Sequence, residues 1–386
     1  MHLVWEEQNG QRVPECTLGE LCAEIFAPLS RSDQRRKGEM YLRGLLSAGG
    51  RKTMRNIAAC VGDRAAEQSL HHFISSSPWE WDAVRAALAR FLERSVRPRA
   101  WVAHSVIIPK AGRHSVGVAR RFVPSLGQVV NSQEVFGIWA AAEGVSSPVN
   151  WRLTLSDDWR DGPRLGDPGI AESSLAETPL ECVAQGALQA QAWVGGAPRP
   201  VVLDLPDTDP AAVARRFGAA GLPFVAGVRG SARVAPAAPG LLGREVREIP
   251  AHQLLRMVRT LRRPVTWTDP VTMGTRTSLV AAVPVRLPGT HRNLVLLGEW
   301  TGTEGWPQQC WLTDLTDAPW GALLRLAKLA QRVAADFSEV SVDVGMVDFE
   351  GRSFGGWHRH TTLASAAHAV HALTTRYRPQ PVARPA

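Results

Sequence analysis

The chain has 386 residues, of which 45% are hydrophobic and 21% charged. A chain of this length forms roughly two or three folding units of about 150 residues each, and its apolar content is enough for a buried core, which excludes extensive disorder. The formal net charge is +8, and the 44 basic residues include only four lysines. Because guanidinium groups bind phosphate oxygens through two N–H donors, an arginine-rich chain points to a polyanionic partner.

The sequence lacks several targeting and metal-binding signatures. The first residues, 1–7, carry acids and no apolar stretch, which argues against a secretory signal. No run approaches the ~20 apolar residues that span a bilayer. The five cysteines form no Cys-X-X-Cys pair, which disfavours a zinc finger and favours a reducing compartment. We therefore expect a cytoplasmic protein with no membrane association.

Residues 18–98 have the spacing of several short helices. Ser77-Pro78-Trp79-Glu80 predicts the start of one of them, with the serine as cap and the proline at the first helical position. These helices carry a set of basic side chains, namely Arg35, Arg36, Lys37, Arg51, Lys52 and Arg55. The pattern fits a DNA-binding helical domain, and the alternative is a helical bundle whose charges are simply solvated.

After residue 100 the periodicity changes to that of strands. Four strands joined by Gly and Ser turns are predicted at 101–108, 117–123, 133–140 and 150–155. A helix is predicted at 180–193, followed by a β-α-β unit with a strand at 200–204, a helix at 211–218 and a strand at 224–228. A β-rich stretch at 235–315 and two late helices at 320–342 and 361–374 come after it. This order predicts an α/β protein with an RNase H-like core. We divide it into a helical N-terminal domain (1–98), the first part of the core (99–234), a β-rich insertion (235–318), and the last core helices with the C-terminal tail (319–386).

Six short segments, in the same order, resemble those of DDE-type insertion-sequence transposases, in the actinobacterial branch with a β-rich insertion before the last catalytic residue. The segments are 77–81, 109–120, 148–153 followed by Trp159, 221–228, 326–329 and 349–360. The resemblance spans about residues 20–375. It implies metal-assisted phosphodiester hydrolysis and strand transfer, in which three carboxylates hold two Mg²⁺ ions ~4 Å apart.

The resemblance also implies where the three carboxylates should stand. Family members carry an Asp-Asp pair where this chain has His104-Ser105, and the second carboxylate corresponds to Asp204. The glutamate of the late helix corresponds to Ala334, and a following lysine corresponds to Ser341. One carboxylate, a histidine and an alanine cannot neutralise two Mg²⁺ ions, which prefer hard oxygen ligands. We therefore expect the two-metal Mg²⁺ site to be lost and no other cofactor to replace it.

The residues at these positions leave two interpretations open. His104 could act as a general base or a new metal ligand that Asp204 orients, or it could be drift in a site that no longer cleaves DNA. Asp204 could also be retained as a helix cap. In the hallmark segment and the strand after it, Lys110, Arg113, Arg120 and Arg121 either contact phosphate or lie at exposed strand edges.

We predict a transposase-like protein that binds DNA but does not cleave it, either domesticated or decaying. The alternative is an enzyme of another class, whose small-molecule active site is the former metal cleft around His104 and Asp204. A third hypothesis is a protein-interaction module that regulates an intact transposase through mixed dimers. The expected partner is DNA, and a small-molecule ligand and a homodimer are further candidates.

Overall fold

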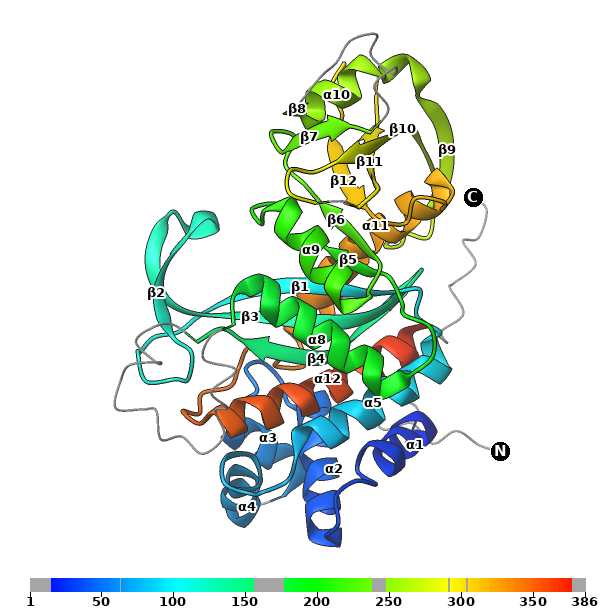
Figure 1. Ribbon diagram of the computed structural model, residues 1–386. Helices are drawn as coiled ribbons and strands as arrows, with labels where there is room; N and C mark the ends of the chain where they lie inside the picture. The colour runs from blue at the N-terminus through cyan, green and yellow to red at the C-terminus, as the bar shows by residue number, and fades with distance from the viewer. Residues whose placement is uncertain are drawn as a thin grey trace, which may run out of the picture.

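A computed structural model of the protein describes residues 15–62, 64–155, 177–237, 248–290, 292–302 and 305–376. As predicted, its N-terminal part is helical. The helices are α1 (Glu15–Ile25), α2 (Ser32–Ser47), α3 (Met54–Val61), α4 (Arg64–Ser75) and α5 (Trp81–Val96). They lie together on one side of the core, at the bottom of Figure 1.

The start of α5 differs from the prediction. The helix begins at Trp81, and the residue before it makes no side-chain cap. Ser77 is buried and accepts a hydrogen bond of 3.2 Å from Nε2 of Gln34. The segment before the helix is held against α4 by Trp79, whose ring stacks on Phe73 and donates its N–H to the Phe73 carbonyl at 3.0 Å. The predicted serine cap was therefore wrong: Ser77 joins this segment to α2.

The centre of the sheet contains three antiparallel and two parallel strands. They are β1 (Ala100–Pro109), β3 (Gln128–Ala142), β4 (Val145–Leu153), β5 (Val201–Leu203) and β6 (Phe224–Gly227). β3 lies between β1 and β4 and is antiparallel to both, whereas β5 and β6 run parallel to β1. Helix α9 (Pro210–Ala220) makes the crossover that a parallel pair of strands requires. A short strand, β2 (Ala119–Val123), pairs with the beginning of β3.

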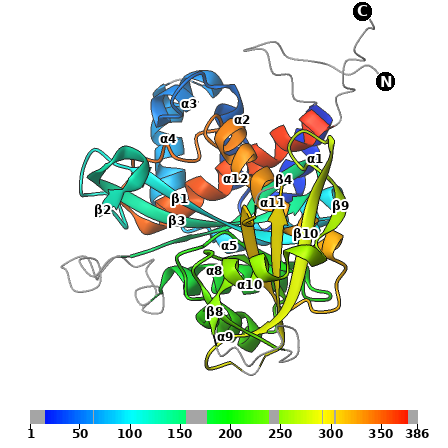
Figure 2. The same cartoon turned by 90° about the horizontal axis from the view of Figure 1, so that it is seen from above.

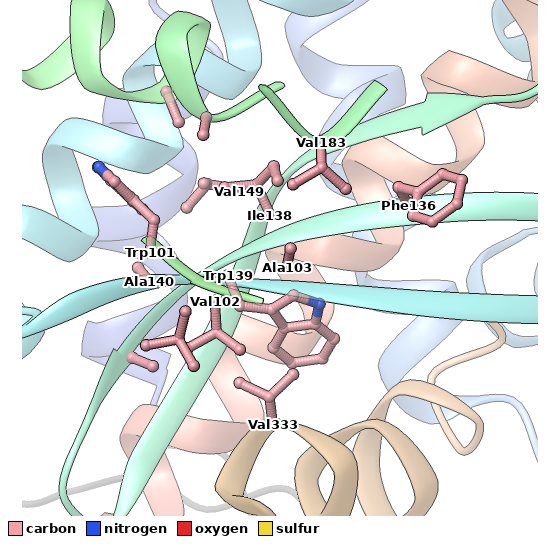
Figure 3. Packing of buried hydrophobic residues seen from close by; sticks show 14 of the residues in the cluster. Trp101, Val102, Ala103, Phe136, Ile138, Trp139, Ala140, Val149, Val183 and Val333 are labelled. Atoms are coloured by element: carbon pink, nitrogen blue, oxygen red, sulfur yellow. The ribbon is translucent and has the colours of Figure 1, made fainter. Parts of the chain in front are cut away.

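Different helices cover the two faces of this sheet. Successive residues of β3 alternate between the faces, as Figure 3 shows. Ile138 points toward Val183 of α8 (Pro179–Val194), and Trp139 points to the other face, where Val333 of the late helix α11 lies. These four side chains are fully buried. The core is therefore filled from both sides, with α11 (Trp320–Asp336) on the side opposite to α8.

The β-rich insertion extends the core sheet. Its elements are β7 (Arg233–Pro236), β8 (Ile249–Pro250), α10 (Ala251–Met257), β9 (Arg263–Thr268), β10 (Thr275–Arg286), β11 (Leu294–Trp300) and β12 (Gln309–Thr313). β12 pairs antiparallel with β6, so strands of both parts form one sheet within the described residues (Figures 1 and 2). This strand order, with a late helix across it, is the predicted RNase H-like fold. The division of the chain at 98, 234 and 318 stays a prediction, and its second boundary lies inside β7.

A buried arginine ties the N-terminal helices to the core. Arg85 of α5 is 1% exposed, and burial lowers its pKa to about 10. Its N–H groups bind acceptors on β4 and on α12 (Phe354–Arg376). The acceptors are Asn150 Oδ1 (3.1 Å), the Trp151 carbonyl (3.1 Å), His358 Nδ1 (3.0 Å), Thr361 Oγ1 (3.1 Å) and Thr362 Oγ1 (2.8 Å). Two of the segments that carry the family resemblance, 148–153 and 349–360, therefore meet at this side chain.

Replacing Arg85 with methionine should destabilise the protein. The change leaves several buried acceptors without donors, at a cost of about 3 kcal/mol or more. The matched control is Arg90→Met, because Arg90 is exposed on the same helix and should change stability by less than ~0.5 kcal/mol. Urea denaturation measures both variants, and equal stabilities would contradict the role assigned to Arg85.

Candidate functional site

His104 and Asp204 occupy neighbouring positions on the α11 face of the sheet. β1 and β5 are parallel, and Ala103 lies opposite Leu203. His104 and Asp204 are the next residues of the two segments, and residues in register on parallel strands point to the same face. The structure therefore brings the two predicted site residues to adjacent positions. Within the described residues, no hydrogen bond joins their side chains.

Aromatic rings surround His104. Its ring lies 5.1 Å from the ring of Phe337 and 6.2 Å from that of Trp139, measured between centroids. Gly137 is the β3 residue opposite His104. A Cβ at this position would come within 2.7 Å of Trp139 Nε1, so only glycine leaves room for the Trp139 ring. Burial in these surroundings lowers the pKa of His104 to about 4 and keeps the imidazole neutral at pH 7. Trp139 Nε1 is buried and has no hydrogen-bond partner among the described residues.

Asp204 lies beside β6 and is open to solvent. Its Oδ1 is 3.3 Å from the point that a Cβ of Gly227 would occupy. Solvent reaches the carboxylate, but the surrounding protein removes part of its hydration and raises its pKa. Asp204 does not cap the helix that follows. The N-cap of α9 is Asp209, whose carboxylate accepts hydrogen bonds from the backbone N–H groups of Ala211 (3.0 Å) and Ala212 (3.1 Å).

The third expected position is a solvent-exposed residue of α11. Ala334 is exposed, whereas its neighbour Val333 is buried against the sheet. The side chain from this region that contacts His104 is Phe337, which begins a short π-helical turn ending at Ser341. Sequence reasoning missed Phe337. The sequence does contain a clue to Phe337, because it follows Val333 by four residues, about one helical turn. This spacing places both side chains on the sheet-facing side of the helix.

The position at which the resemblance implies a lysine serves packing in this chain. Ser341 is buried, and its hydroxyl lies 2.9 Å from Nδ1 of His368. The other ring nitrogen of His368 lies 2.9 Å from the carbonyl of Ser146. Because a carbonyl can only accept, Nε2 carries the proton, and Nδ1 accepts from the Ser341 hydroxyl. The neighbouring acid Glu339 is exposed and does not belong to this network.

Metal ligands are sparse around these residues. Within the described parts of the chain, no group of three or more His, Cys, Asp or Glu side chains is arranged to hold a metal ion. Of the three expected positions, 104, 204 and 334, Asp204 supplies a carboxylate.

The predicted DNA-binding residues fall into two groups. Six are exposed, and they are Arg35, Arg36, Arg51, Arg55, Arg113 and Arg120. Among these, the Arg51 guanidinium lies 3.0 Å from Glu350 and 3.6 Å from Asp348. Arg36 and Arg55 have no ion pair within the described residues. Arg35 has no ion pair there either, but its guanidinium donates to the Leu29 carbonyl at 2.7 Å. Among the predicted N-terminal cations, Arg36 on α2 and Arg55 on α3 are therefore the ones left with neither an ion pair nor a side-chain hydrogen bond in the described parts of the chain.

The other four predicted cations are directed into the protein or paired. Lys52 is 5% exposed and donates its ammonium group to the Ala48 carbonyl. Lys110 donates to the carbonyls of Val347 (3.3 Å) and Phe349 (2.9 Å), and burial lowers its pKa to about 8. Lys37 lies 3.6 Å from the carboxylate of Asp33, and Arg121 lies 3.5 Å from that of Glu134. Of the four, Lys52 and Lys110 hold the chain together rather than presenting charge.

A buried ion pair joins the insertion to α11. Lys328 lies 2.6 Å from Glu299 of β11, and both side chains are almost fully buried. The ammonium group lies 5.0 Å from the Trp267 ring and 5.4 Å from the Trp311 ring, and Ser278 donates to Glu299 at 2.7 Å. Lys328 lies in the segment 326–329 that carries the family resemblance, but its partner was not identified from the sequence. The sequence does contain a clue to this pair, because Glu299 is a single acid inside the otherwise apolar run 294–300. A carboxylate buried in such a run needs a partner of opposite charge.

The fold and the site together define the class of protein. The core is RNase H-like, and two ionisable residues stand at neighbouring positions, His104 on β1 and Asp204 directly after β5. The chain belongs to the family of DDE superfamily endonucleases, whose family description matches residues 24–291. Comparison with curated proteins gives no match.

Membership in this family supports a transposase-like function and interaction with DNA. Positions 104 and 204 lie inside the matched range, and position 334 lies beyond it. No helix of the described residues is long and apolar enough to cross a membrane. Trp159, which extends one of the resembling segments, lies outside the described residues.

The stability of the protein should fall as the pH is lowered from 7 to 5. Burial lowers the pKa values of His104, His360 and His368 to about 4, below the ~6.5 of an unfolded chain. In this pH range the unfolded state takes up protons that the native state does not. The free energy of unfolding therefore decreases, by up to about 1.4 kcal/mol per pH unit for each histidine.

Denaturation by urea at pH 7, 6 and 5 measures this slope. The variant His104→Asn should show a shallower slope than the wild type, because one of the histidines with a lowered pKa is removed. The control is His71→Asn, at an exposed position of α4. A His104→Asn slope equal to that of the wild type would contradict the assignment of His104 as a buried neutral group.

Proposed function

We propose that this protein is a transposase-like protein that binds DNA without cleaving it. The observation that carries the proposal is the packing of His104 against Phe337 and Trp139, at the position where the family resemblance places the first metal carboxylate. A neutral imidazole offsets no positive charge, and a phenyl ring offers no oxygen to Mg²⁺.

The charge at the site also argues against a two-metal centre. Two Mg²⁺ ions bring four positive charges, and the carboxylate at hand is that of Asp204, whose pKa is itself raised. Ala334 adds no ligand from α11. The residues present therefore do not fit the metal pair of the family, and we derive no hydrolytic step from it.

DNA binding is supported by the family and by the exposed arginines of the N-terminal helices. Arg36 and Arg55 have no ion pair within the described residues, and α2 and α3 pack against each other. When unpaired arginine side chains bind DNA phosphates, they release the counterions condensed on the DNA. The affinity for DNA should therefore depend strongly on the salt concentration. Lys52 and Lys110, which the sequence pointed to, are left out of this surface.

The affinity for duplex DNA should fall steeply with added salt. Each phosphate contact contributes about −0.9 to the slope of log K against log[salt]. The variant Arg36→Ala/Arg55→Ala removes two such contacts, so its slope should be less steep than that of the wild type by about 1.8. The control is Arg94→Ala, because Arg94 is paired with Glu24. Fluorescence anisotropy measures each slope. Wild-type protein without salt-dependent affinity for duplex DNA would overturn the DNA-binding part of the proposal.

Mg²⁺ should not bind the wild-type protein tightly, and restoring the carboxylates should change this. Titration calorimetry with Mg²⁺ is expected to give no heat for the wild type and measurable heat for His104→Asp/Ala334→Glu. If the double variant gives none, adding Phe337→Ala tests whether this ring fills the space. Tight Mg²⁺ binding by the wild type that disappears in Asp204→Asn would contradict the loss of the metal site.

A second candidate function is a small-molecule site at the same place. It is favoured by three polar groups without hydrogen-bond partners within the described residues, namely His104, Asp204 and the buried Trp139 Nε1. An unpaired N–H in the protein interior is costly, and a ligand oxygen would satisfy it. A compound that raises the melting temperature of the wild type but not of His104→Ala would favour this function. The metal and DNA measurements above do not depend on it.

A further inference from the structure

The hairpin of β2 and the first residues of β3 has an uncovered face that combines charge with apolar groups. Arg120 lies opposite Asn131, and Phe122 lies opposite Val129. Directly opposed residues of an antiparallel pair point to the same side of a hairpin, so these four side chains share one face. Phe122 is 62% exposed and Val129 is 50% exposed. Apolar side chains this exposed, side by side, are typical of an interaction surface.

The tip of the hairpin continues this surface. Leu126, in the turn η1 (Pro124–Leu126), is 49% exposed. β2 pairs with β3 alone, and within the described residues no strand pairs with its other edge. Figure 1 shows the hairpin as an arm that leaves the body of the sheet at one end. The arm is therefore free to reach a partner without rearrangement of the core.

The charge of the arm indicates what kind of partner it fits. From residue 117 to residue 133 the sequence contains two arginines and no acid. Arg121, on the opposite face, is held by Glu134 at 3.5 Å and by the Ser132 carbonyl at 3.0 Å. Arg120 has no ion pair within the described residues. The positive charge on the exposed face is thus left for an external anion.

A second copy of the chain fits this surface poorly. Pairing two β2 strands edge to edge would bring Arg120 and Arg121 of one copy close to the same residues of the other, and opposed like charges destabilise a sheet. DNA offers what both kinds of side chain require, because phosphates bind arginine and base steps accept apolar wedges. β-ribbons can enter a DNA groove, and minor-groove proteins use apolar side chains to unstack and kink the duplex.

We propose that the β2–β3 hairpin is a DNA-bending arm. Arg120 binds the phosphate backbone, and Phe122, Leu126 and Val129 press against base steps in the minor groove and kink the duplex. The inference rests on the proposed function, since it takes DNA as the partner. It adds a second contact region, distant in sequence from the arginines of the N-terminal helices, and it assigns that region a mechanical effect on the DNA.

Energy transfer between dyes at the two ends of a duplex of about 30 bp measures the bend in a complex with the full chain. The wild type should bend the duplex. The variant Phe122→Ala/Leu126→Ala should lose most of the bend and about tenfold in affinity, with an unchanged salt slope. Arg120→Ala should lower the salt slope by about 0.9. The control is Met257→Ala, because Met257 is 44% exposed on α10, away from the arm.

The outcomes separate this inference from the proposed function. If Phe122→Ala/Leu126→Ala binds and bends DNA as the wild type does, the arm has no role in bending and the inference is wrong, while DNA binding stands. If the wild type shows no affinity for duplex DNA, the proposed function fails first. Sedimentation of the wild type and of the same variant without DNA tests whether the face instead binds a second copy of the chain. A change from dimer to monomer with the bend unchanged would assign the face to a second copy and overturn the proposal.

Discussion

The parallel pairing of β5 with β1 is the constraint on which the rest of the structure depends. Its register places position 204 beside position 104 on one face of the sheet, and α11 covers the same face. β6 pairs with β5, and β12 of the insertion pairs with β6, so the insertion is also positioned by this contact. The buried Lys328–Glu299 pair then fixes α11 against the extended sheet. A slip of β5 by one residue would turn Asp204 to the other face.

In the proposed function, the site has exchanged metal binding for packing. Carboxylates held close together repel one another unless a cation lies between them. A histidine at position 104 and an alanine at position 334 remove two of these charges, and the Phe337 ring can then pack against a neutral imidazole. The fold around the site is held by groups that need no metal, such as Arg85 with its acceptors and His368 between Ser341 and Ser146. Under this proposal, part of the net charge of +8 reflects lost acids as well as DNA contacts.

Periodicity predicted most of the elements, and short motifs predicted the family. The strand at 101–108 and the helices at 180–193 and 211–218 were located within a few residues of the observed β1, α8 and α9. What could not be predicted depends on contacts between residues distant in sequence. Lys52 reads as a surface cation until the 345–353 loop covers it, and Ser77 reads as a helix cap until Gln34 approaches. Phe337 reaches His104 across more than 200 residues of chain, beyond any local pattern.

The most direct test of the central claim is an assay of phosphodiester cleavage on the DNA that the protein binds. Supercoiled plasmid is incubated with wild-type protein and Mg²⁺ or Mn²⁺ at low salt, and the nicked and linear forms are measured. The account predicts that the plasmid is retarded by binding but stays supercoiled at every metal concentration. Metal-dependent nicking that disappears in Asp204→Asn would contradict it, because His104, Asp204 and Ala334 would then support the chemistry that we infer to be lost.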